Sequence, residues 1–234
     1  MSLSSLIPEK YLFRLIDLKN IFGRGFAKTH YSQSGEDILV GKLFTKKDGF
    51  YVDVGAYHPE HYSNTYLLWK QGWRGMNIDP NPESISFFKR RRSQDINLEL
   101  GVSSENKELA YYIFNHKSCN TFSREQKEKM EKRSYIRLLE TRTVPCLPLR
   151  NILARHLPAG VQIDFMNIDV EGLDIEVLAS NDWDRFSPTV IAIEDVNFSV
   201  EKPLESRVYA FLTKKGYRLF AFTGMTLIFK QVVN

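Results

Sequence analysis

The chain has 234 residues, of which 43% are hydrophobic and 26% charged, and its formal net charge is +4. These values are ordinary for a globular domain and exclude disordered, collagen-like and coiled-coil chains. No apolar run approaches the roughly 18 residues that span a bilayer, so we expect no transmembrane segment. A net charge of +4 over this length makes a weak field, and we expect no nucleic-acid partner.

The two cysteines, Cys119 and Cys146, form neither a C-x-x-C pair nor a pattern with nearby histidines. This spacing excludes a disulfide framework and a zinc site, and it favours a reducing compartment. The first six residues lack the charged start and long apolar stretch of a secretory signal. We therefore expect a cytoplasmic protein.

Residues 1–30 are expected to form a helical extension ahead of the main domain. Apolar side chains recur at helical spacing in residues 6–22, Pro8 suits a helix start, and Gly23-Arg24-Gly25 suits a cap and linker. Such a helix either docks on the domain or contacts a membrane surface or a partner. The sequence leaves these alternatives open, and it does not indicate an oligomeric state.

Strands and helices alternate in the rest of the chain. After a helix over 36–44, the pattern predicts strands at 49–54, 73–78, 95–102, 109–114, 163–168 and 188–193, and helices at 64–71, 83–92, 151–156, 174–178 and 204–215. Residues 123–142 are highly charged and predict an exposed helix or a flap. A closing antiparallel hairpin is expected at 217–222 and 226–232, turned at Gly224. Alternation of this kind is typical of βαβ units and a parallel sheet.

Acidic residues stand at the ends of most of these strands. Four of them, Asp53, Asp79, Asp169 and Glu194, follow or close a predicted strand, whereas the third strand has no such acid at its end. Ligands of an open α/β sheet bind outside the carboxyl ends of its strands. Buried strands have no structural need for acids at their tips, so we expect these carboxyl groups to form a site.

The loop after the first strand indicates which ligand this site takes. Gly55 would let the backbone approach a ligand, and Asp79, 26 positions after Asp53, suits the two hydroxyls of a ribose. These features suit NAD or S-adenosylmethionine (SAM). The loop reads GAYHPEH, without the G-x-G-x-x-G that cradles a pyrophosphate, which favours SAM. Asp53 and Glu171 would then suit its amino or sulfonium charge.

Three segments, in chain order, resemble the FkbM-type methyltransferase domain. They are YSQSGEDILV at 31–40, VDVGAYHPEHYSNTYLLWKQGWRGMNIDPNP at 52–82 and NIDVEGLDIEVL at 167–178. The resemblance implies a SAM-dependent methyltransferase domain over 31–234, of α/β class. It implies a class I, Rossmann-like doubly wound sheet of about seven strands, with the last strand antiparallel and helices on both faces.

The resemblance also implies roles for individual residues. The residues expected to bind the cofactor are Asp53, Gly55, Ala56, Asn64, Thr65, Asp79, Pro80, Glu171 and Glu36. Gln33 and Asp37 are expected to close over the site with Glu36, and Gly172 to lie at the end of the fourth strand. The loop departs from many methyltransferases in having one glycine rather than two or three.

The implied activity is methyl transfer from SAM (EC 2.1.1.-), most simply to a hydroxyl of a glycan or other small natural-product acceptor. A hydroxyl needs a general base, and the candidates are Asp169, Glu194 and His58. His58 and His61 could join the acids around a divalent ion, but no spacing demands it, and we expect no metal. Residues 118–121 are either a substrate-side loop or a plain turn. The basic run at 89–92 is either a solvated helix end or a contact for an acidic acceptor.

Two other function classes remain open from the sequence. One is an oxidoreductase that binds NAD or a nucleotide sugar, which a cofactor absorbance spectrum would reveal. The other is a non-catalytic binding module on the same fold, which measurable turnover of SAM would exclude. A nucleic-acid methyltransferase is less compatible with the chain, because the [DN]-P-P-[YF] motif is absent.

Overall fold

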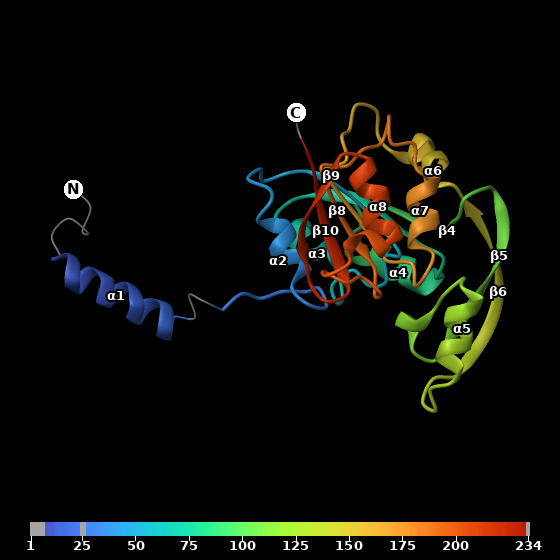
Figure 1. The fold of residues 1–234 in the computed structure, drawn as a ribbon, viewed down its shortest axis with the longest axis horizontal. Coiled ribbons are helices and arrows are strands. Elements are labelled where there is room, and N and C mark those ends of the chain that lie inside the picture. Colours follow the sequence, from blue (N-terminus) through green and yellow to red (C-terminus); the bar gives the residue numbers. More distant parts are fainter. Residues whose placement is uncertain (1–7, 24–26, 233–234) are drawn as a thin grey trace. The chain divides into compact units, whose positions relative to one another are not determined.

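The structure, a computed structural model, describes residues 8–23 and 27–232. The chain divides into two compact units, Met1–His30 and Tyr31–Asn234 (Figure 1). Helix α1 (Glu9–Phe22) belongs to the first unit, and the Gly23 amide caps it by donating to the Lys19 carbonyl at 2.7 Å. Residues 6 and 7 of the predicted helix, and Arg24-Gly25 of the predicted linker, lie outside the described residues. Among the described helices, none is long and apolar enough to cross a membrane.

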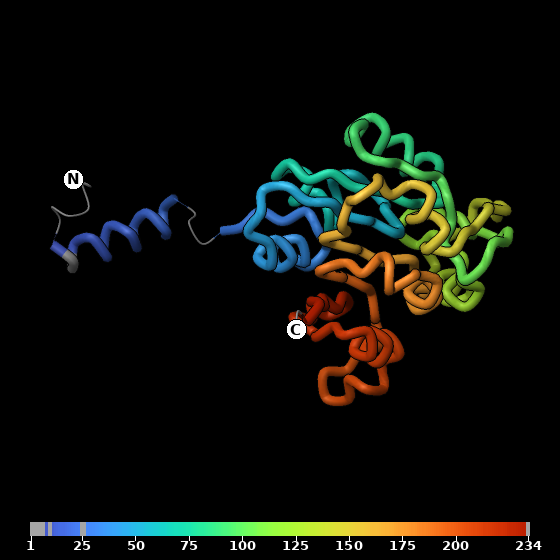
Figure 2. The backbone as a smooth tube through the Cα atoms, turned by 90° about the horizontal axis from the view of Figure 1, so that it is seen from above, coloured from blue at the N-terminus to red at the C-terminus, as the bar shows by residue number. Residues whose placement is uncertain are grey.

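A seven-stranded sheet forms the centre of the second unit. Its strands are β1 (Phe50–Val54), β2 (Arg74–Asp79), β3 (Ile96–Glu99), β7 (Phe165–Ile168), β8 (Val190–Glu194), β9 (Tyr217–Phe222) and β10 (Thr226–Gln231). They lie in the order β3-β2-β1-β7-β8-β10-β9, parallel except for β10, which is antiparallel to β8 and β9. The predicted α/β doubly wound sheet with an antiparallel last strand is confirmed. Figure 2 shows the C-terminal strands, in red, and helix α4, in teal, on opposite sides of this unit.

Helices cover both faces of the sheet because its strands alternate their side chains. Val52 and Val54 face a core shared with α6 (Leu149–His156), α7 (Asp174–Ser180) and α8 (Arg207–Lys214). Tyr51 points to the other face, where α2 (Glu36–Gly41) and α3 (Tyr66–Lys70) pack. Helix α4 (Pro82–Arg91) contacts β2 and β3. This period-2 alternation is what a strand buried on both faces requires.

A smaller sheet departs from the predicted elements. Its strands are β4 (Gly101–Val102), β5 (Lys107–Phe114) and β6 (Leu138–Leu147), and a 3-10 turn η2 (Lys117–Cys119) and helix α5 (Arg124–Glu131) lie between β5 and β6. The strand predicted at 95–102 is therefore divided at Leu100 between the two sheets. The prediction of a helix or flap throughout 123–142 is wrong for residues 138–142, which begin β6. These residues pair with β5 far away in the chain, a pairing that local charge spacing does not reveal.

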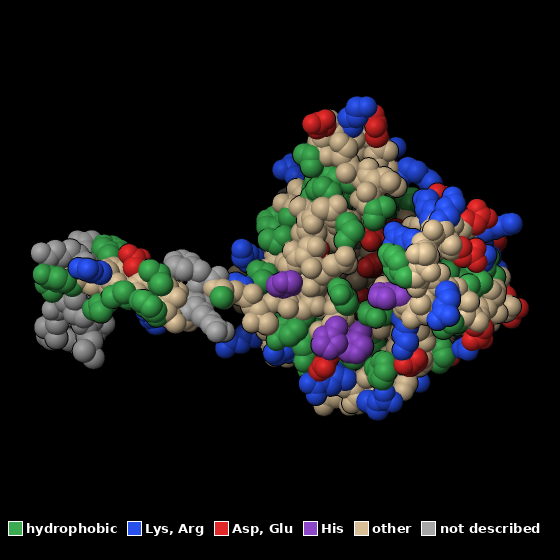
Figure 3. Space-filling view, turned by 90° about the horizontal axis from the view of Figure 1, so that it is seen from below, with side chains coloured by type: hydrophobic (Ala, Val, Ile, Leu, Met, Phe, Trp, Pro, Cys, Tyr) green, Lys and Arg blue, Asp and Glu red, His purple; other side chains and the backbone are tan. Residues whose placement is uncertain are grey.

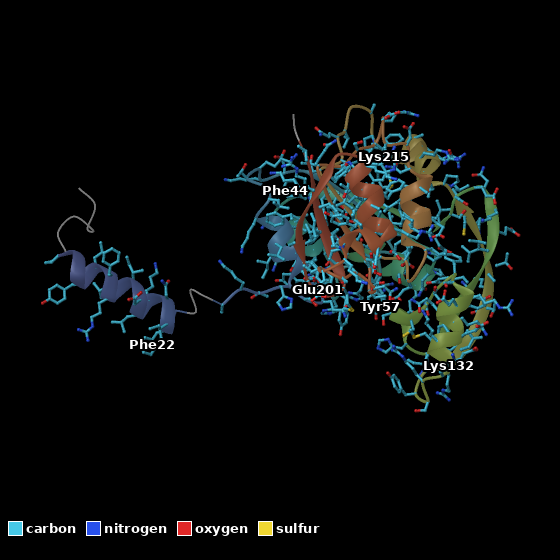
Figure 4. The ribbon with its side chains drawn as sticks, viewed as in Figure 1. Phe22, Phe44, Tyr57, Lys132, Glu201 and Lys215 are labelled. Atoms are coloured by element: carbon cyan, nitrogen blue, oxygen red, sulfur yellow. The ribbon has the colours of Figure 1, made fainter. Side chains whose placement is uncertain are left out.

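The carboxyl ends of the parallel strands define one edge of the unit. Tyr57 follows β1 and Glu201 follows β8, and both lie along this edge, whereas Phe44 and Lys215, which precede strands, lie away from it (Figure 4). The β5–β6 hairpin stands out beside the sheet (Figure 1). A second 3-10 turn, η3 (Pro203–Glu205), lies between β8 and α8. The strand-end loops and the hairpin together enclose the site.

Candidate active site at the carboxyl ends of the strands

A cavity of about 340 Å³ lies at this edge of the sheet. Acidic side chains are visible at the bottom of a hollow whose rim carries histidines (Figure 3). The sequence-predicted residues that line the cavity are Glu36, Asp53, Gly55, His58, Asn64, Asp79, Pro80, Asp169, Glu171 and Glu194. Gln33 also lines it. Ala56, Thr65, Asp37 and Gly172 do not.

Gly55 is required where β1 meets β7. Its φ is +84°, and a Cβ at this position would lie 1.7 Å from the Asp169 carbonyl oxygen. The amides of Gly55 and Ala56 both donate to the Ile78 carbonyl, at 2.9 and 3.1 Å. The loop is therefore closed by backbone contacts, and these two amides are not free to contact a ligand.

A network of hydrogen bonds supports Asp53 at the centre of the sheet edge. Its two carboxyl oxygens accept from Asn167 Nδ2 at 2.9 Å and from Thr65 Oγ1 at 2.8 Å. Asn64 Nδ2 donates to Asn167 Oδ1 at 2.8 Å, and Thr65 Oγ1 accepts from Arg92 Nη1 at 2.9 Å. Burial raises the pKa of Asp53. Thr65 therefore holds Asp53 in place without lining the cavity itself. Asn167 is a polar residue within an apolar strand, and the sequence analysis did not identify it as a site residue.

Arg92 is the buried cation of this network. Its guanidinium also donates to Tyr51 Oη and Ser63 Oγ, each at 3.0 Å, and to the Pro59 carbonyl. The solvated helix end predicted for the basic run 89–92 is therefore wrong for Arg92, which is 1% exposed. A signal was present in the sequence: Arg92 follows Ile85 and Phe88 at the i, i+3, i+7 spacing of an inward helix face.

Four carboxyl groups at the strand ends have raised pKa values. The pKa is about 8 for Asp79, about 6 for Asp169, about 8 for Glu171 and about 9 for Glu194. Burial is the first cause in each case, and the charge of a neighbouring carboxylate is a further one. At neutral pH, Asp169 is therefore ionised while the other three largely hold protons.

The loop after β7 holds Glu171 in a strained conformation. Glu171 has φ +54°, a region that non-glycine residues rarely adopt. Thr121 Oγ1 donates to its carbonyl at 2.9 Å, and Asp174 accepts from the Val170 and Gly172 amides at 3.1 and 3.2 Å. Strain of this kind costs about 1–3 kcal/mol and clusters at functional sites. The hairpin and Asp174 together fix the backbone on both sides of Glu171.

Two polar groups in the cavity have unused hydrogen-bonding capacity. Asp79 accepts from the Asn81 amide at 2.7 Å through Oδ1, and Oδ2 accepts from none of the residues that the structure describes. Asn120 accepts from the Phe114 amide at 2.9 Å, but its buried Nδ2 has no partner in hydrogen-bonding geometry, although Tyr111 lies beside it. Residues 118–121, of which Ser118, Asn120 and Thr121 line the cavity, thus form part of its wall.

His58 has a structural role in its own turn. Its Nδ1 accepts from the amides of Glu60 and His61, each at 3.1 Å, and its ring stacks on His61. Burial lowers its pKa, followed by the charge of His61. With Nδ1 accepting, the proton of the neutral ring lies on Nε2, so the nitrogen left for the cavity is a donor. Among the described residues, no three metal-ligating side chains come together.

Glu36 joins the segment before α2 to the cavity. Its carboxylate accepts from the Ser34 amide at 2.8 Å and from Thr223 Oγ1, in the β9–β10 turn, at 2.6 Å. Asp37 instead accepts from the Tyr31 amide and Ser32 Oγ, each at 2.7 Å, and so fixes the local turn. Of these two acids, only Glu36 faces the cavity.

Comparisons with known proteins agree with this architecture. The family model of the methyltransferase FkbM domain matches residues 53–219, more than half of the 234 residues. A comparison with curated proteins gave no significant match.

Similar solved structures include a precorrin-6y C5,15-methyltransferase from Geobacter metallireducens, at 14% identity and TM-score 0.45 over 87% of this chain and 90% of that chain. A TehB-like SAM-dependent methyltransferase from Corynebacterium glutamicum has 13% identity and TM-score 0.41 over 96% and 97%. These likenesses are too distant to carry a conclusion. The family model is sufficient alone: the chain belongs to the FkbM family of SAM-dependent methyltransferases.

Proposed function

We propose that the protein methylates a hydroxyl group of a sugar, glycan or other natural-product acceptor, with SAM as the donor. One observation carries the proposal. The carboxyl groups at the ends of β2, β7 and β8 meet in one cavity, and one of them, Asp169, has a pKa of about 6 among neighbours at about 8 or 9. Groups whose environments push their pKa values apart are typical of acid–base sites.

The residues of the cavity fit SAM. The uncommitted oxygen of Asp79 suits a ribose hydroxyl, and the ionised carboxyl group of Asp169 suits positive charge. When bound, SAM supplies a methyl group on a positively charged sulfur. We assign Asp79 to cofactor binding, and Asp53 and Asn64 to the network that holds the loop in place.

Asp169 is the general base in this proposal. A base must be ionised near the working pH and must reach the proton that it removes. Asp169 lines the cavity directly after β7, and its carboxyl oxygens accept no hydrogen bond from the described residues. Its carboxylate can therefore take the proton of an acceptor hydroxyl placed beside it.

Glu194 and His58 suit other roles. At a pKa of about 9, Glu194 holds its proton at neutral pH and can donate a hydrogen bond to an acceptor oxygen. His58 uses Nδ1 to fold its turn, which leaves a donor rather than a base. These arguments favour Asp169 over both alternatives.

Calorimetric titration with S-adenosylhomocysteine (SAH), beside NAD, tests the proposal. We expect micromolar binding of SAH and none of NAD, followed by turnover of SAM when hydroxyl acceptors are added. Binding of NAD alone would favour an oxidoreductase, and SAH binding without turnover on any acceptor would favour a binding module. Absence of SAH binding in a folded protein would overturn the proposal.

A further inference from the structure

The cavity extends beyond the part that suits a nucleoside. It runs along the strand ends from Asp79 on β2, past β1, β7 and β8, to Met225 and Thr226 at β10. Four strand spacings of about 4.8 Å make this span roughly 19 Å. The β2 and β1 end carries the groups that suit the cofactor, so the end over β7, β8 and β10 is left for the acceptor.

Acidic residues dominate this second end. Glu36, Asp169, Glu171 and Glu194 line it. Among the described residues, the basic ones that line the cavity are His58, His116 and Lys117. Lys117 pairs with Glu83 and the His58 ring packs against Phe87, both on α4, and the His116 ring is hydrogen-bonded to Ser118. Arg133, on the hairpin, acts on the charge of Glu171 without lining the cavity.

An aromatic pair lies at the rim. Tyr62 is 66% exposed and lines the cavity with Tyr57, and their ring centroids are 6.3 Å apart. Tyr62 has φ +51°, a rare conformation for a bulky residue. The next residue, Ser63, donates its amide to the Tyr31 carbonyl at 3.0 Å, which ties this rim to the segment carrying Gln33 and Glu36.

These three features suit one class of acceptor. A tyrosine ring offers a flat apolar face, on which the C–H face of a sugar ring can pack. Carboxyl groups accept hydrogen bonds from hydroxyl and amine groups and donate them when protonated. A carboxylate or phosphate on the acceptor would instead meet like charge without a cation to pair with it.

We propose that Tyr62, Glu36 and Glu194 select an uncharged or amine-bearing sugar ring and reject acidic sugars. This inference rests on the proposed function, because it names what the second end of the cavity accepts. Tyr62 supplies the stacking face, Glu194 supplies a hydrogen bond, and the carboxylates of Glu36 and Asp169 exclude anions.

Three derivatives of one sugar ring, one neutral, one cationic and one anionic, test the selection. Methyl glucoside, its 2-amino analogue and its 6-carboxylate are titrated by saturation-transfer NMR into protein saturated with SAH. We expect the carboxylate to bind at least about tenfold more weakly than the uncharged ring, and the amine at least as tightly as the uncharged ring. Equal or tighter binding of the carboxylate would overturn the inference, as would absence of binding by all three rings.

Variants separate the contribution of the stacking face from that of the carboxyl groups. Tyr62→Ala should weaken binding of the uncharged ring by roughly tenfold. Tyr62→Phe keeps the stacking face and should bind this ring as the wild type does. Tyr135→Ala is the matched control, because Tyr135 is 68% exposed and does not line the cavity. Glu36→Gln removes a carboxylate that lines the cavity and should narrow the discrimination against the carboxylate-bearing ring.

SAH affinity distinguishes this inference from the proposed function. We expect it to be unchanged in Tyr62→Ala. If SAH binds and a Tyr62→Ala variant binds the ring normally, the acceptor assignment is wrong while methyl transfer stands. If SAH does not bind the wild type, the proposed function itself fails.

Discussion

On the β1 side of the cavity, both oxygens of Asp53 accept hydrogen bonds from protein side chains, and the Arg92 guanidinium donates to four different residues. On the β7 and β8 side, the carboxyl groups of Asp169 and Glu194 accept none from the residues that the structure describes. Both sides are acidic and largely buried. A connected hydrogen-bond network fixes geometry, whereas buried acids without partners keep perturbed pKa values and free lone pairs. The β1 side therefore holds the site in shape, whereas the β7 and β8 side carries the groups that can take part in the reaction.

The largest expected effect comes from removing the guanidinium of Arg92, the buried cation on the β1 side of the cavity. Arg92→Met leaves the hydrogen-bond acceptors of Tyr51, Pro59, Ser63 and Thr65 buried without their donor. Loss of one partner of a buried charged network costs about 3–5 kcal/mol, so the free energy of unfolding in urea should fall by that amount. Arg91→Met is the matched control, since Arg91 makes a surface ion pair with Glu60, and its effect should be far smaller. Similar losses in the two variants would show that the buried network is not the main support.

Asp169→Asn tests the reactive side. Removing a general base lowers kcat by about 10²–10⁴-fold. The unfolding free energy and the SAH affinity should change little, because Asp169 makes no side-chain hydrogen bond to the described residues. The base works as a carboxylate, and its pKa is raised to about 6, so kcat/KM of the wild type should rise with pH through about 6. This rise of kcat/KM with pH should be absent in Asp169→Asn.

Glu171→Gln is the matched control for Asp169→Asn. Glu171 is adjacent in the cavity but has a pKa of about 8, so it is mostly neutral at pH 7 and an amide resembles it. A loss of kcat in Glu171→Gln as large as in Asp169→Asn would move the base to Glu171.

Asp79→Ala tests the cofactor end of the cavity. The variant removes an oxygen that accepts no hydrogen bond from the described residues, together with one that accepts from the Asn81 amide. Uncharged hydrogen bonds contribute roughly 0.5–1.5 kcal/mol, so at pH 7 SAH should bind about 2- to 12-fold more weakly by calorimetry. Asp79→Asn keeps an acceptor oxygen, so its SAH affinity should fall less than that of Asp79→Ala. Wild-type affinity in Asp79→Ala would contradict the placement of the cofactor over β2.

The sheet and the position of the site could be predicted because both depend on local patterns. Alternating periodicity shows the parallel strands, and a parallel sheet brings their carboxyl ends together, so Asp79, Asp169 and Glu194 were expected in one place before any coordinates. Gly55 was expected as well, although for close approach to a ligand. The structure gives a different reason, which is its contact with the Asp169 carbonyl.

The remaining features depend on contacts that are distant in sequence. Strand β6 pairs with β5 across the whole hairpin, and its charges at 140–142 resemble those of an exposed helix. Arg92 lies in a basic run, and its burial follows from packing against Tyr51 and Ser63 rather than from the run. The role of His58 is decided by the four-residue turn at 58–61, in which two backbone amides donate hydrogen bonds to its Nδ1. Apart from the inward helix spacing of Arg92, hydrophobic periodicity indicates none of these contacts.

The smallest expected effect comes from a change in the segment between β5 and β6, where Thr121 contacts the loop after β7. Thr121 Oγ1 donates to the Glu171 carbonyl and accepts from the Ser123 amide, both at 2.9 Å. Thr121→Val keeps the shape and removes both hydrogen bonds, so the free energy of unfolding should fall by about 1 kcal/mol each. Thr121→Ser keeps the hydroxyl and should retain most of the wild-type stability. Because Glu171 is held at φ +54° beside Asp169, Thr121→Val should also raise KM for the acceptor while kcat stays within a few-fold. A loss in Thr121→Ser equal to that in Thr121→Val would assign the effect to packing of the methyl group rather than to the hydrogen bond that joins the hairpin to the reactive side.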